Sequence, residues 1–237
     1  LLADTATPPL QPRDIVVMVP DIEAFAPAIR SVFGACPRGD ARHIPWGITD
    51  QRERGQQPLL VALEWLLRAP SPRASLSELQ SLLDVPAVAR RLGVDSADLP
   101  LLAAWMQGAG IRWGLHGAHR AQLGLAACGD GNTAQFGLQR MLLGYASGQA
   151  GAFAGIEPFD EVAGLSAALA GALAQLLQTL DGWWQGATQP RTPVAWAMQA
   201  RALLAAVFEA GDDVERALLA ALDTALADWL DACAQAG

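Results

Sequence analysis

The sequence contains no lysine, and all 16 of its basic residues are arginines. Lysine reaches the phosphates of a nucleotide from a phosphate-binding loop, forms Schiff bases, and pairs with ATP in protein kinases. The absence of lysine therefore excludes these three kinds of catalytic site from the 237 residues. The HExxH and GxSxG motifs are also absent, which excludes the zinc-peptidase motif and the nucleophile elbow.

Cysteine is scarce, and Cys36, Cys128 and Cys233 lie far apart. Three cysteines without a CxxC pair support neither a disulfide framework nor a zinc ribbon, so we predict no metal site and a reduced, cytoplasmic chain. No apolar run reaches the roughly 18 residues that a membrane span needs. The N-terminus has no Met and no basic stretch ahead of an apolar one, so we expect an internal piece of a longer protein rather than a signal peptide.

Charge is unevenly distributed along the chain, whose net charge is −8. Residues 1–150 hold 13 arginines and 13 carboxylates, whereas residues 151–237 hold 3 arginines and 11 carboxylates. Nucleic-acid binding needs a basic face that displaces the counterions of the phosphates. The sequence therefore leaves only the first part as a candidate DNA surface.

The first 70 residues carry the pattern of a small α/β lobe. Residues 14–19 form a continuous β-branched run, which is typical of a buried parallel strand, and residues 43–48 indicate a second short strand. Apolar residues at helical spacing predict helices over 21–33 and 58–68. We therefore predict a partial α/β lobe over residues 1–70, whose two strands need further strands to complete a sheet.

From residue 71 onward the pattern predicts an all-helical subdomain that reaches residue 237. Ser75 followed by Glu78 is typical of a capping box at the start of a helix. Residues 108–131 hold seven glycines and predict irregular structure. Long helices are predicted over 161–185, 192–209 and 212–234. The boundary between the two lobes is expected at 69–75.

Three groups of polar residues could carry chemistry, and each has a simpler structural interpretation. His116 and His119 could share a metal, but no carboxylate or cysteine lies at ligand spacing, so a surface loop is favoured. Residues 129–133 precede a helix and could hold an anion, but an ordinary turn with a helix cap is favoured because lysine is absent. The third group complements the dipole at a predicted helix start: Asp212, Asp213 and Glu215.

Eight tryptophans are many for this length. Five lie on helical apolar stripes, so we expect them in the core: Trp65, Trp105, Trp184, Trp196 and Trp229. Trp46, Trp113 and Trp183 fit a stripe less well. Each of these could stack on a base or anchor a partner chain, although packing inside the protein is favoured.

Several strings of residues resemble the second motor domain of superfamily 1 DNA helicases, and within that group the RecC family of exodeoxyribonuclease V gamma subunits. The strings are LQPRDIVVMV (10–19), IPWGITD (44–50), GIRWG (110–114) and FGLQRMLLGYA (136–146), followed by the weaker match PFDE (158–161) with Gly164 and Leu165. The resemblance implies a mainly α fold, in which residues 1–70 are a partial RecA-like (helicase 2A-like) β-α-β-α start and residues 71–237 a helical, 2B-like subdomain.

The resemblance also implies a non-catalytic role in DNA repair and recombination. Members of this family are similar in fold to helicases, have lost the ATP-binding motifs, hold RecB and RecD motor subunits together and guide unwound DNA. No catalytic or cofactor-binding residue is expected here, because ATP and Mg²⁺ are bound by the other subunits. Gln56 and Gln57 stand nearest to the place where active relatives carry an arginine that approaches the nucleotide, and Arg52 and Arg54 are displaced from it.

Arg112, Trp113 and Arg140 lie inside the matching strings and are the predicted DNA contacts, because arginine and aromatic side chains supply phosphate contact and stacking. The alternative is that Arg112 and Arg140 order the irregular segment 108–131 by binding backbone carbonyls. Two other functions stay open: an autonomous helical interaction domain unrelated to helicases, and an active helicase or nuclease subunit.

Overall fold

The computed structural model describes residues 11–12, 15–19, 22–34, 43–47, 57–69, 71–148 and 151–235. The chain divides into two compact units, Leu1–Gln57 and Pro58–Gly237. Helix α3 (Pro58–Leu67) therefore belongs to the same compact unit as all later helices. The domain bounds 1–70 and 71–237 remain a prediction.

The predicted α/β lobe is wrong. In the first unit the structure describes one helix, α1 (Ile22–Phe33), and residues 15–19 and 43–47 form no strand. Val16, Val17 and Met18 are 81%, 78% and 90% exposed, although their β-branched run predicted a buried strand. A strand forms only when a neighbouring strand satisfies its backbone groups, and β propensity alone does not supply that neighbour.

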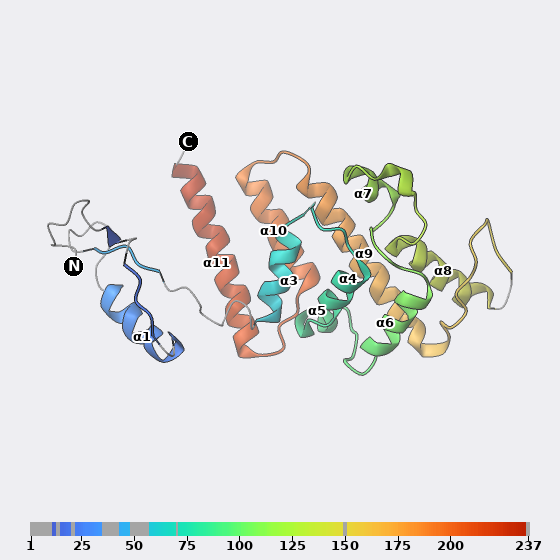
Figure 1. The fold of residues 1–237 in the computed structure, drawn as a ribbon, viewed down its shortest axis with the longest axis horizontal. Coiled ribbons are helices and arrows are strands. Elements are labelled where there is room, and N and C mark those ends of the chain that lie inside the picture. The colour runs from blue at the N-terminus through green and yellow to red at the C-terminus, as the bar shows by residue number, and fades with distance from the viewer. Residues whose placement is uncertain are drawn as a thin grey trace. The chain divides into compact units, whose positions relative to one another are not determined.

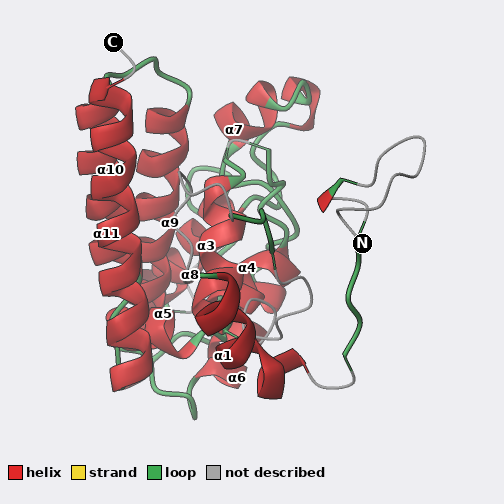
Figure 2. Cartoon of the chain, turned by 90° about the vertical axis from the view of Figure 1, so that its left-hand side faces the viewer, coloured by secondary structure: helices red, strands yellow, loops and turns green. Residues whose placement is uncertain are grey.

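The correction extends to the whole described part of the chain. Figure 2 draws helices and loops there, and the one β-type contact is an isolated antiparallel bridge between Phe153 and Ile156. The RecA-like β-α-β-α start implied by the resemblance is therefore contradicted for these residues. The protein is helical where it is described.

The second unit contains nine α-helices and two 3₁₀ turns within its described residues (Figure 1). Their bounds are α3 (Pro58–Leu67), α4 (Leu76–Leu83), α5 (Pro86–Arg91), α6 (Leu99–Gly108), α7 (Gly117–Gln122), η2 (Ala126–Cys128), α8 (Ala134–Ser147), η3 (Gly164–Ala167), α9 (Ala168–Ala187), α10 (Pro193–Val207) and α11 (Asp213–Gln235). The three long helices predicted from the sequence correspond to α9, α10 and α11. None of the helices in the described part of the chain combines the length and the apolar composition that a membrane span requires.

Local capping chemistry fixes several helix starts. Ser75 accepts a hydrogen bond from the Glu78 backbone and the Glu78 carboxylate accepts one from the Ser75 backbone, so the predicted capping box of α4 is confirmed. Burial would raise the pKa of Glu78, but hydrogen bonds from Ser75 and the Trp65 indole outweigh it and lower the pKa below its ordinary 4.5. Thr192 caps α10 ahead of Pro193, because its side chain accepts a hydrogen bond from the Ala195 backbone.

Helix α9 is the central helix of the core, and it lies between α8 and α10 (Figure 1). Ten of its 20 residues are buried, because leucines, alanines and tryptophans recur on more than one face. Near its end the Trp184 ring packs against Trp65 of α3, with centroids 5.6 Å apart, and the Trp183 indole donates to the Leu66 carbonyl at 2.7 Å. These contacts fasten α3 to the helices that follow it.

The last two helices form a hairpin held to α5. The Glu209 backbone donates to the Ala87 carbonyl at 2.9 Å, and Arg90 donates to the Glu209 carbonyl at 3.1 Å. Arg90 also pairs with Glu215 in the first turn of α11. Farther along, Arg201 of α10 pairs with Asp223 of α11 at 2.5 Å.

Candidate functional site

The segment between α6 and α8, which holds the predicted DNA contacts, is organised by one buried guanidinium. Arg120 of α7 is 2% exposed. Its Nη1 donates to the carbonyls of Cys128, Gly129 and Gly131 at 3.2, 2.8 and 2.8 Å, and its Nη2 donates to the Trp113 carbonyl at 2.8 Å. The guanidinium carbon also lies 4.2 Å from the centre of the Trp113 ring. Four carbonyls of this segment therefore converge on one side chain. The predicted irregular structure of residues 108–131 is wrong for α7 and η2, which lie inside the segment.

Arg120 was missed by sequence reasoning. The available signal was an arginine inside a glycine-rich segment, where irregular backbone leaves carbonyls without helix or sheet partners. A planar guanidinium with five N–H groups suits several such carbonyls at once. Thr133, which closes the segment, caps α8 by accepting from the Phe136 backbone, so the predicted turn with a helix cap is confirmed.

Arg112 lies on the surface of this segment. Its Nη1 donates to the carbonyls of Ile111 at 2.9 Å and Gln107 at 3.2 Å. The Arg112 carbonyl accepts from the Leu76 backbone. Two residues later the Gly114 backbone donates to the Arg73 carbonyl, so the two chain segments are hydrogen-bonded at both places. Within the described residues Arg112 forms no ion pair, so its positive charge faces solvent without a carboxylate partner.

Arg140 and Trp113 occupy more enclosed positions. Arg140 of α8 is half-buried, and it donates from Nη1 to the Ala109 carbonyl at 2.7 Å and from Nε to the Glu157 carbonyl at 2.9 Å. It therefore ties the end of α6 and the segment before α9 to α8. Trp113 is half-buried beneath Arg120. Arg112 and Trp113 are neighbours in the chain, and Arg140 reaches the same segment through its hydrogen bond to the Ala109 carbonyl.

His116 is the N-cap of α7 and His119 lies within that helix. The predicted surface loop is therefore wrong for His119. His119 is 2% exposed, stacks on Trp184 and accepts at Nδ1 from the Leu115 backbone at 3.2 Å. His116 caps α7 by accepting at Nδ1 from the His119 backbone, and its Nε2 lies 2.7 Å from a carboxylate oxygen of Asp181 in α9. Since both Nδ1 atoms accept, the ring protons reside on Nε2.

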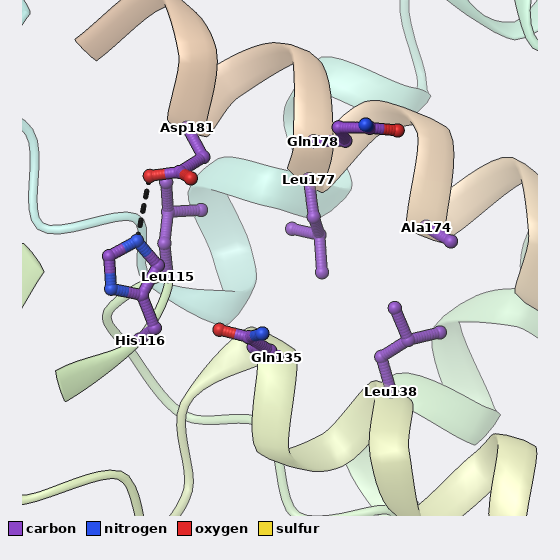
Figure 3. Close-up of a pocket in the computed structure, with 8 residues that line it drawn as sticks. All are labelled: Leu115, His116, Gln135, Leu138, Ala174, Leu177, Gln178 and Asp181. Carbon is purple, nitrogen blue, oxygen red and sulfur yellow. Dashed lines mark hydrogen bonds and ion pairs between the residues drawn. The ribbon is translucent and has the colours of Figure 1, made fainter. Parts of the chain in front are cut away.

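A pocket of about 210 Å³ opens beside the His116–Asp181 pair (Figure 3). Leu138 of α8 and Leu177 of α9 face each other across it, and the amides of Gln135 and Gln178 border it. The Nε2 atom of His116 and the Oδ1 atom of Asp181 are already bound to each other, and the Oδ2 atom of Asp181 accepts from Gln185. No group of three or more His, Cys, Asp or Glu side chains suited to a metal occurs among the described residues. The pocket offers apolar contact and amide hydrogen bonds.

Comparison of the sequence with known proteins identifies its family. The family described as "RecBCD enzyme subunit RecC fourth domain" matches residues 56–237. The chain belongs to the RecC family. The match covers α3 through α11 and therefore the whole second unit that carries Arg112, Arg120 and the histidines.

Proteins named RecBCD enzyme subunit RecC are similar in sequence to most of the chain. The one from Escherichia coli is 41% identical over 212 residues, which cover 89% of this chain and 19% of the relative. Those from Haemophilus influenzae and Mycobacterium tuberculosis are 33% and 36% identical, and cover 87% and 80% of this chain and 18% of each relative. The chain thus spans about a fifth of the length of the curated RecC relatives it matches.

Proposed function

We propose that the chain is one domain of a longer RecC-type subunit of an exodeoxyribonuclease V complex in the cytoplasm. Its role is that of a non-catalytic scaffold in double-strand-break repair and recombination, which holds RecB-type and RecD-type subunits and guides unwound DNA. The observation that carries this proposal is the 41% identity to Escherichia coli RecC over 89% of the chain. The alternative of a helical interaction domain unrelated to helicases does not account for that identity.

In this proposal ATP and Mg²⁺ are bound by other subunits. The complete lack of lysine supports this division of labour, because a phosphate-binding loop needs a lysine at the β- and γ-phosphates. Side chains of the described segment between α6 and α8 are engaged in ordering the backbone, as Arg120 and Arg140 show. The domain therefore contributes shape and surface to the complex.

We further propose Arg112, with Trp113 and Arg140 beside it, as the DNA-facing part of the domain. Arg112 supports this best, since its side chain is exposed and its charge is unpaired within the described residues. The hydrogen bonds of Arg140 to Ala109 and Glu157 favour an ordering role for that residue, through which it would hold the DNA-facing segment in place.

The test is reconstitution of the complex from the full-length subunit that carries this chain and RecB-type and RecD-type subunits of the same organism. We expect the three to co-purify, the RecC-type subunit alone to hydrolyse no ATP, and its addition to increase processive duplex unwinding by the motors. DNA-stimulated ATP hydrolysis that stays with the RecC-type subunit through a further chromatography step would overturn the non-catalytic role. Failure to associate with either motor subunit would overturn the scaffold role.

A further inference from the structure

The pocket beside His116 lies between α8 and α9, which run antiparallel (Figure 1). Its apolar part is formed by Leu138 of α8, which faces Ala174 and Leu177 of α9 (Figure 3). The pocket is open in the folded domain. A hollow between two packed helices has the shape that accepts the side-chain ridge of a third helix.

The apolar side of α8 continues beyond this pocket. Leu142 and Tyr145 follow Leu138 at spacings of four and seven residues, so the three side chains lie on the same side of the helix. Leu142 is 45% and Tyr145 56% exposed. We call the pocket together with Leu142 and Tyr145 the α8–α9 face. From Gln135 to Tyr145 it follows α8 for about 15 Å, or roughly three helical turns.

Charged side chains are scarce on the two helices that form this face. Helix α8 has 14 residues and one charged side chain, Arg140, and α9 has 20 residues and one, Asp181, whereas 17% of the whole chain is charged. Arg140 binds two backbone carbonyls, and Asp181 binds His116 and Gln185. Helix surfaces that face water are normally charged and polar, whereas the centre of a protein interface is depleted of charge.

The end of the face at Tyr145 is bordered by acidic residues. A Cβ atom at Gly144 would overlap the backbone of Phe159 and lie 3.0 Å from the Asp160 nitrogen, so this segment packs directly on the last turns of α8. Asp160 and Glu161 are exposed and form no ion pair within the described residues. An occupant of the face therefore meets apolar and amide groups along its length and unpaired negative charge at this end.

We propose that the α8–α9 face is an interdomain docking surface for an amphipathic helix supplied by another domain of a longer RecC polypeptide. The docked helix inserts an apolar side chain into the pocket, covers Leu142 and Tyr145, and places Arg or Lys beside Asp160 and Glu161. The proposal rests on the proposed function, in which the chain is one domain of a longer subunit. The matching family is described as a fourth domain, and the relatives have about four fifths of their length outside this region.

Charge and tethering favour this occupant over three others. DNA binding needs positive charge, but the unpaired charge beside this face is negative. A second copy of the chain would bring a second acidic end without a free cation, because α8 and α9 contribute only Arg140, which is bound to carbonyls. A helix of the same polypeptide is held near the face at high effective concentration, which a separate subunit lacks.

Cysteine accessibility tests the proposal on the full-length subunit with its native cysteines replaced by serine. Gln178→Cys places a thiol at the exposed rim of the pocket, and Ala220→Cys is the control at an exposed position of α11, between the exposed Arg216 and Thr224. Each labelling rate is divided by that of the same variant unfolded in urea. We expect maleimide to label the pocket thiol at least roughly tenfold more slowly than the control, in the subunit alone and at all protein concentrations.

Two changes should release the docked helix without altering the labelled position. Leu142→Glu places a charge among the apolar contacts, and Asp160→Arg combined with Glu161→Arg repels the basic end of the helix. All three positions are exposed in the domain, so the fold should tolerate the changes, and circular dichroism checks it. In either background the labelling of the pocket thiol is expected to approach the control rate.

Four outcomes would overturn the proposal. They are equal labelling of both thiols, protection that arises only when RecB-type and RecD-type subunits or forked DNA are added, protection that depends on the concentration of the subunit alone, and protection that persists in both release backgrounds. The second and third assign the face to a partner subunit, to DNA or to a second copy. Labelling needs no complex assembly, so a protected thiol in a subunit that binds no motor would contradict the proposed function and leave the docking surface standing.

Discussion

The imidazole of His119 lies flat on the indole of Trp184, with ring centroids 4.6 Å apart and planes 13° from parallel. The Nδ1 atom of His119 accepts from the Leu115 backbone, and its Nε2 atom is buried without a hydrogen-bond partner among the described residues. Burial lowers the pKa of His119 below its ordinary 6.5, and the neighbouring His116 and Arg120 lower it further, against opposing effects of the Pro72 backbone and Asp181. The folded protein therefore favours the neutral ring.

The first prediction is a loss of stability in mild acid. Above pH 6.5 His119 is neutral in both states, but below it the unfolded chain takes up a proton that the folded chain resists, so the free energy of unfolding falls as the pH decreases. Urea unfolding between pH 7.5 and 5 measures this slope. In His119→Gln, whose amide oxygen can still accept from Leu115, the slope should be smaller. A slope equal to that of the unsubstituted protein would show that another group is responsible.

The second prediction concerns the guanidinium that binds four carbonyls. Arg120→Met should lower the free energy of unfolding by about 3 kcal/mol, because it removes four hydrogen bonds and leaves several part-buried carbonyls without a donor. Arg120→Lys should lose less, since one ammonium reaches fewer of them. The control Arg91→Met changes an exposed arginine of α5 and should stay within about 0.5 kcal/mol. Denaturant unfolding decides, and a loss as small as that of the control contradicts the role of Arg120.

The third prediction compares two helical glycines. In α8, a Cβ atom at Gly144 would overlap the backbone of Phe159, whose N–H donates to the Arg140 carbonyl, so Gly144→Ala should destabilise the domain by about 2 kcal/mol. In α9, a Cβ atom at Gly182 would meet nothing within 4 Å, and Gly182→Ala should stabilise it by about 0.5–1 kcal/mol. Thermal unfolding of both variants checks the pair. The same sign for both changes would mean that the packing of residues 157–160 on α8 is not as described.

The fourth prediction tests the DNA-facing role of Arg112. In the assembled complex, Arg112→Ala should weaken binding of forked DNA and reduce the slope of log K against log salt by about 1, because one phosphate contact is lost. Arg91→Ala serves as the control for loss of an exposed arginine. Arg140→Ala should act mainly on stability, since it removes hydrogen bonds to Ala109 and Glu157. An unchanged salt slope for Arg112→Ala would refute its contact with phosphate.

Much of the helical part could be predicted from the sequence because its signals are local. The capping box of Ser75 and Glu78, the Thr192 cap and the carboxylates at the start of α11 act within one helical turn. Apolar spacing likewise located α10 and α11 to within a few residues. The predicted 161–185 helix corresponds to α9, which begins only at Ala168, because residues 161–163 are not helical and Gly164–Ala167 form the 3₁₀ turn η3. Such signals need no knowledge of distant parts of the chain.

The candidate site was harder to predict because its contacts join residues far apart in sequence. His119 is buried only because Trp184, 65 residues later, provides a flat apolar surface, and its spacing from His116 gave no sign of this. Trp229 fits the helical stripe that predicted a core position, yet it is 42% exposed. Periodicity identifies an apolar face, and only the packed neighbours decide which face is covered.

The sequence by itself determined the helices, their caps and the family, because each depends on residue identity at short spacing or on whole strings of residues. The tertiary structure alone decided that residues 15–19 and 43–47 form no strand, that Arg120 is enclosed by carbonyls, and that Trp229 of α11 is exposed. Strand pairing, burial and exposure are properties of two surfaces that meet. They are fixed when distant segments pack together, and no single segment encodes them alone.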